Sequence, residues 1–220
     1  RLIARFMTEY ENSAARHRVL VQDVKYLSRA HRARVVARQR DVVAGFMNVF
    51  NTAMNARTME AMQIGPRDRV LEIGFGGGPN LAPMAARARE GLVTGIDISG
   101  DMVSRARKSH RKLVTSGRLE LHQGSIQDMP FRAGSFDSAC SVNNVYFWPD
   151  AASALGEVKR VLKPGGVLVI TFRPRSVLAP LRLLASGTLR FYSGDDIADM
   201  LREAGFTDVE VRTHRVWLDI

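Results

Sequence analysis

Four glycines lie close together immediately after a hydrophobic run in the stretch VLEIGFGGG, residues 70–78. Because glycine destabilises the interior of helices and strands, such a cluster is typical of a place where the backbone comes very close to another group. A strand that ends in a glycine-rich turn and continues into a helix is how many α/β proteins hold a nucleotide. The stretch therefore predicts a ligand site at the end of a buried strand.

Strand and helix patterns alternate along the chain after this turn, which predicts a doubly wound, mostly parallel sheet. The expected strands are residues 69–75, 92–99, 119–124, 138–142 and 167–172, with a strand-like alternation at 208–220, and the expected helices are residues 80–89, 100–113, 153–162 and 193–206. Residues 1–62 contain no proline and one glycine and are expected to be helical. A Gly-Pro break follows them, so we predict a helical extension at 1–62 and a sheet domain at 63–220.

The spacing of the glycines excludes two familiar nucleotide sites. A dinucleotide fold carries G-x-G-x-x-G, but the position of the third glycine is Pro79. A phosphate loop needs Gly-Lys-Ser/Thr, which does not follow. The observed pattern is G-x-G-x-G, with Glu72 two residues before Gly74. A carboxylate there would repel a pyrophosphate and attract an ammonium group.

A second acid extends this argument to a nucleoside. Asp97 ends the second predicted strand, 19 residues after Gly78. An acid at this place accepts hydrogen bonds from ribose hydroxyls in other nucleoside-binding sheets. An amino acid joined to a nucleoside satisfies both carboxylates, so Glu72 and Asp97 predict S-adenosylmethionine (SAM) as the ligand.

From about Met47 to its C-terminus the chain resembles class I SAM-dependent methyltransferases. The matching segments are VLEIGFGGG for the family's first motif, GIDIS for the second, GSIQDMPF after the third strand, FDSACSVNNVYFWPD at the fourth strand and EVKRVLKPGG before the fifth. The resemblance implies a Rossmann-like sheet of seven strands with an N-terminal helical extension. It also implies an enzyme that transfers a methyl group and uses SAM as its cofactor.

The resemblance further implies which residues contact SAM, namely Glu72, Gly74, Gly76, Gly78, Asp97, Ile98, Ser125, Ile126, Gln127 and Asn143. In this assignment Glu72 faces the amino group of the methionine part, Asp97 binds the ribose and Ile98 packs on the adenine. Residues 125–127 meet the adenine edge. Many relatives carry Asp in place of Ser125, so an uncharged acceptor here implies weaker binding of adenine.

The candidate catalytic residues are Asn143 and Tyr146, just after the predicted fourth strand. Methyl transfer from a sulfonium is an in-line displacement, in which the protein mostly supplies alignment and desolvation. An amine or carboxylate acceptor needs little acid–base help, whereas a phenol or carbon acceptor usually needs a base. Tyr146, His31 and Asp150 are the candidates for such a base. Asn143 and Asn144 also fit ordinary turn residues.

The sequence narrows the class of acceptor. The segment NNVYFW lacks the prolines of the Asn/Asp-Pro-Pro-aromatic motif, which argues against adenine N6 or glutamine as the methylated group. The single cysteine, Cys140, cannot supply the thiols for arsenite methylation and is expected to be a buried apolar residue. The five histidines lack the spacing of metal ligands, so no metal is expected. A small organic acceptor remains.

Positive charge is concentrated near the N-terminus. The net charge is +10, and residues 16–40 carry eight Lys or Arg against one acid. We expect a helical lid over the cofactor, built from the N-terminal helical extension at 1–62 and from the Arg- and Leu-rich residues 173–192, which suits an anionic, partly apolar acceptor. An anionic membrane surface would also suit these segments. A solvated helical face is the plain alternative for the basic region.

Four functions therefore stay open. The favoured one is a methyltransferase acting on a small molecule, and the second acts at a membrane surface on a lipid or lipophilic metabolite. The third methylates RNA or protein, and the fourth binds SAM without turnover. No apolar run reaches the ~18 residues of a membrane span and no secretory signal is visible, so a cytoplasmic location is expected.

Overall fold

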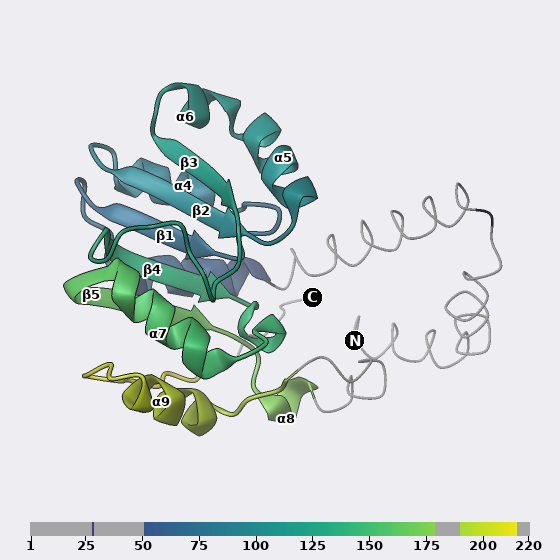
Figure 1. The fold of residues 1–220 in the computed structure, drawn as a ribbon, viewed down its shortest axis with the longest axis vertical. Coiled ribbons are helices and arrows are strands. Elements are labelled where there is room, and N and C mark those ends of the chain that lie inside the picture. The colour runs from purple at the N-terminus through teal and green to yellow at the C-terminus, as the bar shows by residue number, and fades with distance from the viewer. Residues whose placement is uncertain (1–27, 29–50, 179–189, 215–220) are drawn as a thin grey trace. The chain divides into compact units, whose positions relative to one another are not determined.

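The computed structural model describes residues 28, 51–178 and 190–214 of the 220-residue chain (Figure 1). Contacts between residues divide the chain into two compact units, of which one runs from Met54 to Thr213 and the other holds the remaining residues. All the strands that the structure describes belong to the unit Met54–Thr213. That unit is therefore the one that can be compared with the predicted sheet.

Five parallel strands form the sheet in the order β3-β2-β1-β4-β5. They are β1 (Arg69–Ile73), β2 (Leu92–Asp97), β3 (Leu119–Gln123), β4 (Phe136–Val142) and β5 (Leu162–Thr171). The inner strands β1, β2 and β4 are almost wholly buried, which explains why their sequences are continuous apolar runs. Because the strand order reverses between β1 and β4, ligands are expected at the carboxyl ends of these two strands.

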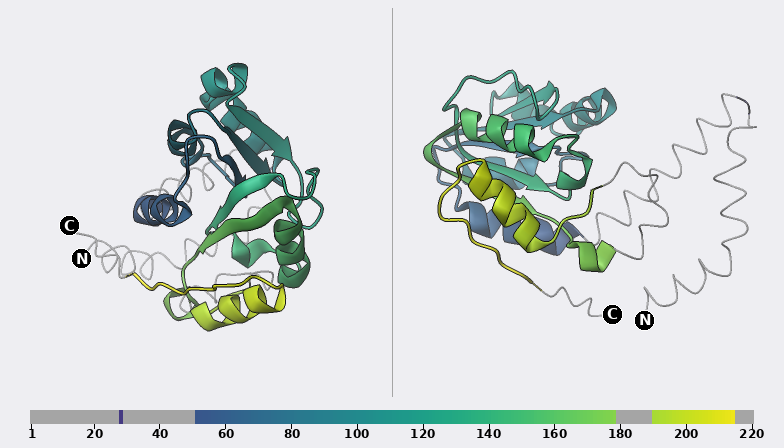
Figure 2. Two further views of the ribbon diagram at one scale, coloured as in Figure 1. Left: turned by 90° about the vertical axis from the view of Figure 1, so that its left-hand side faces the viewer. Right: turned by 60° about the horizontal axis from the view of Figure 1, so that its bottom comes forward.

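Helices cover both faces of the sheet (Figures 1 and 2). The helical segments of the described residues are 51–62, α4 (Leu81–Arg87), α5 (Gly100–Ser109), α6 (Arg111–Thr115), the 3-10 turn η2 (Val145–Phe147), α7 (Ala151–Val161), α8 (Arg175–Leu178) and α9 (Gly194–Glu203). One buried cluster contains Met62, Met84 and Val103, from the helix at 51–62, α4 and α5. A second contains Leu155 and Ile197, from α7 and α9. The unit is therefore a three-layer α/β/α sandwich.

Polar side chains fix where several helices begin. Ser193 and Asp196 form a capping box at α9, in which each side chain accepts from the other residue's backbone N–H. Ser193 is thus the N-cap of this helix. Asp150 caps α7 by accepting from the N–H of Ala152 at 3.1 Å. These caps satisfy N–H groups that have no partner inside the helix.

The prediction of seven strands is wrong for the described residues, which contain five. Residues 207–214, expected to alternate as a strand, have no regular structure, and residues 215–220 lie outside the described ranges. Asp208 has a left-handed backbone (φ +53°), which interrupts an extended chain. Glu210 and Arg212 then pair with each other at 2.7 Å on an exposed surface instead of facing a core.

Two other boundaries differ from the expectation. The helix expected at 100–113 breaks at His110 into α5 and α6, and the His110 ring reaches back to another loop. The fifth strand begins at Leu162, five residues earlier than expected. Its pairing with β4 shifts register between Phe136 and Ser138, and this irregularity lets the turn at Gly165 lie within the strand.

Among the described residues, no helix has both the length and the hydropathy that crossing a bilayer requires.

Candidate functional site

The glycine-rich turn follows β1 at the point where the strand order reverses. Gly74 has φ +66°, and a Cβ built on it would lie 1.1 Å from Nδ2 of Asn144, so only glycine fits. A Cβ on Gly76 or Gly77 would meet nothing within 4 Å. One side of the turn is thus tightly packed and the other faces open space, where a ligand can approach the backbone.

Two neighbouring asparagines follow β4, at the same edge of the sheet as the glycine-rich turn. Asn144 donates from Nδ2 to the carbonyl of Ile73 at 3.4 Å and fills the space that Gly74 leaves. Asn143 has a left-handed backbone (φ +52°), and its N–H donates to the carbonyl of Thr171 at 2.8 Å. Asn144 was not among the predicted site residues, and its only signal in the sequence is the Asn pair directly after the fourth strand.

Asp97 connects the end of β2 to the glycine-rich turn. Its Oδ2 accepts from the N–H of Gly76 at 2.8 Å, and its Oδ1 accepts from the N–H of Ser99 at 2.9 Å. The residue is 9% exposed. Each carboxylate oxygen can accept more than one hydrogen bond, so both stay able to accept from hydroxyl groups of a ligand.

Glu72 lies in the middle of the sheet, 2% exposed, with Gly95 and Cys140 as its partners on the two neighbouring strands. Its Oε1 accepts from Nδ2 of Asn80 at 2.8 Å, and its Oε2 is buried without a partner among the described residues. Burial raises the pKa of Glu72 to about 7; the bond from Asn80 opposes this rise and the charge of Asp97 adds to it. The carboxyl group can therefore gain or lose a proton near neutral pH.

The adenine side of the expected site has one strongly exposed apolar side chain. Ile98, directly after Asp97, is 75% exposed. By contrast, Ile126 is 9% exposed and belongs to the core cluster beneath α7. The hydroxyl of Ser125 accepts from the N–H of Gln127 at 3.2 Å. Of the predicted adenine contacts, Ile98 is thus the one that offers an apolar surface to a ligand.

Tyr146 is held by backbone groups. It is 6% exposed, its hydroxyl accepts from the N–H of Arg173, and it lies within donating distance of the carbonyl of Arg173 (3.1 Å) and of Oδ1 of Asn143 (3.3 Å). Burial raises the pKa of this phenol to about 12. Such a group links two loops and is a poor base near neutral pH. Asp150 is occupied as a helix cap, and His31 lies outside the described residues.

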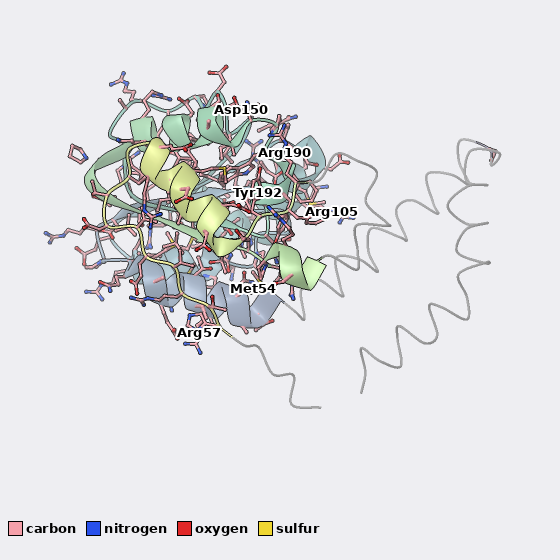
Figure 3. The ribbon with its side chains drawn as sticks, turned by 90° about the horizontal axis from the view of Figure 1, so that it is seen from below. Met54, Arg57, Arg105, Asp150, Arg190 and Tyr192 are labelled. Carbon is pink, nitrogen blue, oxygen red and sulfur yellow. The ribbon has the colours of Figure 1, made fainter. Side chains whose placement is uncertain are left out.

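Other contacts bring the helix at 51–62 and the segment before α9 to the same edge. The hydroxyls of Thr58 and Thr171 lie 2.6 Å apart, and Asn143 donates from Nδ2 to the sulfur of Met54 at 3.5 Å. The N–H of Arg190 donates to the carbonyl of Tyr146 at 3.2 Å. Figure 3 labels Met54 on its helix and Arg190 on the segment that enters α9.

The predicted residues are therefore divided in space as follows. Glu72, the glycines, Asp97 and Asn143 meet at the carboxyl ends of β1, β2 and β4. Most of both expected lid segments, namely residues 1–27, 29–50 and 179–189, lies outside the described residues. Within those ranges, no three His, Cys, Asp or Glu side chains come close enough together to hold a metal ion.

A parallel sheet with a glycine-rich turn after β1, a buried acid within β1 and a second acid at the end of β2 defines the class I SAM-dependent methyltransferases. Residues 71–170 match the family described as Methyltransferase domain. The chain is 33% identical over 172 residues to the uncharacterized methyltransferase YdaC of Bacillus subtilis, covering 78% of this chain and 90% of that protein. The chain belongs to this methyltransferase family, and its cofactor is SAM.

Two further comparisons agree with this assignment. The fatty-acid O-methyltransferase of Mycolicibacterium smegmatis is 34% identical over 133 residues, which are 56% of this chain and 47% of that enzyme. The crystal structure of a SAM-dependent methyltransferase from Aquifex aeolicus matches with a TM-score of 0.58 at 20% identity, covering 69% of this chain and 78% of that one. The structural match supports the fold, and the chain spans about half the length of the fatty-acid enzyme.

Proposed function

We propose that this protein methylates a small, lipophilic organic acid on its carboxylate. When bound, SAM supplies a methyl group on a positively charged sulfur, which an acceptor oxygen attacks in line to give a methyl ester and S-adenosylhomocysteine. The observation that carries the proposal is the arrangement of side chains at the carboxyl ends of β1, β2 and β4. There the described side chains hold and orient, and none of them is placed as a general base.

The residues at the carboxyl ends of β1 and β2 fit the three parts of SAM. The buried Glu72 has an oxygen without a partner among the described residues, which suits an ammonium group. Asp97 has two oxygens that can still accept hydrogen bonds from ribose hydroxyls. Ile98 offers an exposed apolar face beside it for the adenine. The open side of the turn at Gly76 and Gly77 lets the cofactor lie against the backbone.

The described site residues offer no suitable base, which suits a carboxylate or an amine acceptor, and the proposal is for the carboxylate. Tyr146 uses its hydroxyl for backbone contacts, and its pKa is raised. A carboxylate is already ionised at neutral pH, so it needs alignment rather than deprotonation. Good alignment contributes roughly 7 kcal/mol or more in well-oriented reactions. The relative from Mycolicibacterium smegmatis is named for a fatty acid, which also supports a lipophilic acid.

The proposal includes a lid. The segment from Arg173 to Tyr192 connects β5 with α9, and Tyr146 contacts both of its ends. The hydroxyl of Tyr146 bonds the backbone of Arg173, and the backbone carbonyl of Tyr146 accepts from the N–H of Arg190. Phe147, which follows Tyr146 in the chain, is 63% exposed. A cover over this edge would exclude water from the displacement and shield such apolar surface.

The test is a methyl-transfer assay on the full chain with isotopically labelled SAM. The acceptor panel contains saturated fatty acids of several lengths, phenols, amines and short RNA. We expect a labelled methyl ester from a medium or long carboxylic acid and no transfer to RNA. Transfer to phenols or amines alone would overturn the carboxylate proposal. Product formation only with vesicle-bound acceptors would favour the alternative of an enzyme that works at a membrane surface.

A further inference from the structure

Asn80 occupies a helix N-cap position but does not act as a cap. It precedes α4, and its carbonyl accepts from the N–H of Met84 at 2.9 Å, as expected at the start of a helix. Asn is a favoured N-cap because its side chain can accept from a free N–H of the first turn. Here the side chain makes no such bond. Its amide instead donates to Oε1 of Glu72 at 2.8 Å, and the residue is 3% exposed.

The groups around Glu72 make this one bond important. Asp97 on β2 opposes a negative charge on Glu72, and so does burial. On β4, Cys140 lies opposite Glu72, and burial and the Glu72 charge both raise the pKa of its thiol, which keeps it neutral. Asn80, from α4, is the neighbour that stabilises the ionised carboxylate. Without its N–H, both oxygens of Glu72 would lack a described donor.

We propose that Asn80 is a positioning residue for SAM, whose amide holds Oε1 of Glu72 and thereby leaves Oε2 for the ammonium group of the cofactor. This inference rests on the proposed role of Glu72. A bond to one oxygen fixes the plane of the carboxylate, because rotation about its terminal torsion is otherwise broad. It also favours the charged form, which is the form that attracts an ammonium group.

The consequence is a pH dependence of SAM binding. The pKa of Glu72 is raised to about 7, so its ionised fraction increases as the pH rises from 5.5 toward 7.5, and SAM affinity increases with it. At higher pH the α-amino group of SAM itself loses its proton, since the ordinary pKa of such a group is about 7.7–8.0. Removal of the Asn80 amide takes away a group that lowers this pKa. The midpoint of the affinity profile then moves to a higher pH.

The experiment measures the dissociation constant of SAM by calorimetry between pH 5.5 and 8.5, on the full chain and its variants. For Asn80→Ala we expect at least tenfold weaker binding at pH 7 and a midpoint at higher pH. Asn80→Asp distinguishes positioning from capping, since Asp is as good a cap as Asn. It should bind SAM more weakly than Asn80→Ala, because two neighbouring carboxyl groups cannot both ionise easily.

Two controls separate a local effect from a general one. Adenosine lacks the ammonium group, so its affinity should be the same for Asn80→Ala and the native chain. Ser193→Ala removes a genuine cap, that of the remote α9, and should lower thermal stability without moving the midpoint. If adenosine binding falls as much as SAM binding does, Asn80 acts only on the shape of the site and the inference is wrong.

Glu72→Gln separates this inference from the proposed function. If Glu72→Gln binds SAM as the native chain does, with the same pH profile, the proposed role of Glu72 fails and the inference fails with it. If Glu72→Gln loses affinity and pH dependence while Asn80→Ala and Asn80→Asp keep the native midpoint, Glu72 retains its role and only the positioning role of Asn80 is overturned.

Discussion

Glu72 is an acid buried within a strand, and this placement has opposite consequences for binding and for stability. Its pKa in the folded chain is about 7, against 4.5 as its ordinary value. Between these two values the folded state binds more protons than the unfolded state, so stability falls as the pH rises. The resulting loss in the free energy of unfolding is complete above pH 7 and amounts to about 3 kcal/mol.

Replacement of Glu72 by Gln should therefore stabilise the cofactor-free protein at high pH. We expect native stability to fall between pH 5 and pH 8, and the stability of Glu72→Gln to change much less. At pH 8 the variant should be more stable by about 1–3 kcal/mol, while its SAM affinity is lower. Urea unfolding of both proteins at pH 5.5 and 8 measures this difference. Parallel pH curves would mean that Glu72 is ionised in the folded state throughout this range.

Asp97→Ala should weaken SAM binding at least tenfold. The change removes acceptors for the ribose, and hydrogen bonds to charged groups contribute about 1.5–3 kcal/mol each. It also leaves the N–H groups of Gly76 and Ser99 without Asp97, so some loss of thermal stability should accompany it. Asp97→Asn keeps one acceptor oxygen, so its SAM affinity, measured by calorimetry, should lie between that of the native chain and that of Asp97→Ala.

Asp101→Ala is the matched control, because Asp101 is a nearby but exposed acid in the first turn of α5. It should leave SAM affinity within twofold of the native value. An equal loss for the two alanine variants would mean that general negative charge, and not the contacts of Asp97, governs binding.

The glycine-rich turn offers a test at the scale of an element. Gly74→Ala places a side chain at φ +66° and against the amide of Asn144. The left-handed conformation alone costs roughly 1–2 kcal/mol for a residue other than glycine. We expect a lower melting temperature and weaker SAM binding. Gly77→Ala, which has open space and no positive φ, should change the stability of the cofactor-free protein by less than about 0.5 kcal/mol.

A second variant tests whether Asn144 is part of the problem. Gly74→Ala combined with Asn144→Ala removes the overlap but keeps the unfavourable φ. The double variant should therefore be more stable than the sum of the two single changes predicts. Strict additivity in thermal unfolding would show that Asn144 does not occupy the space beside Gly74.

The same elements show what the sequence could predict. Strands β1 to β4 were located within a few residues, because buried parallel strands are short apolar runs that turn residues delimit. The break at His110 could not be predicted, since the ring reaches the carbonyl of Gly78 at 3.0 Å, 32 residues away. The expected strand at 208–214 was wrong because alternation does not reveal that Asp208 adopts a left-handed backbone.

The site divides in the same way. The position of Glu72 and Asp97 beside the glycine-rich turn could be predicted, because their distances from the glycines along the chain carry the signal, and their roles toward SAM stay predictions. Asn80 and Asn144 were missed as site residues, since their roles depend on contacts between elements, to Glu72 and to the carbonyl of Ile73. Asn at a helix start or after a strand looks like a cap or a turn residue in the sequence.

At the scale of the whole molecule, the sheet and the candidate site belong to one compact unit. That unit runs from Met54 to Thr213 and includes the glycine-rich turn, Asp97 and Asn143. The basic region at residues 16–40 lies outside it and, except for residue 28, outside the described residues. Cofactor binding and the contribution of the basic region can therefore be separated by truncation.

Deletion of residues 1–40 should leave a protein that folds and binds SAM, because the strands and the glycine-rich turn all lie downstream. If the basic region is part of a lid, as the sequence led us to expect, the truncated protein should lose most methyl transfer to a soluble acceptor, since water then enters during the displacement. Calorimetry with SAM, the methyl-transfer assay and flotation with anionic vesicles, applied to both forms, measure these properties. Normal turnover with reduced vesicle binding would instead identify a membrane anchor. Normal turnover with unchanged vesicle binding would mean that the eight basic residues form a solvated surface, and both roles would then be abandoned.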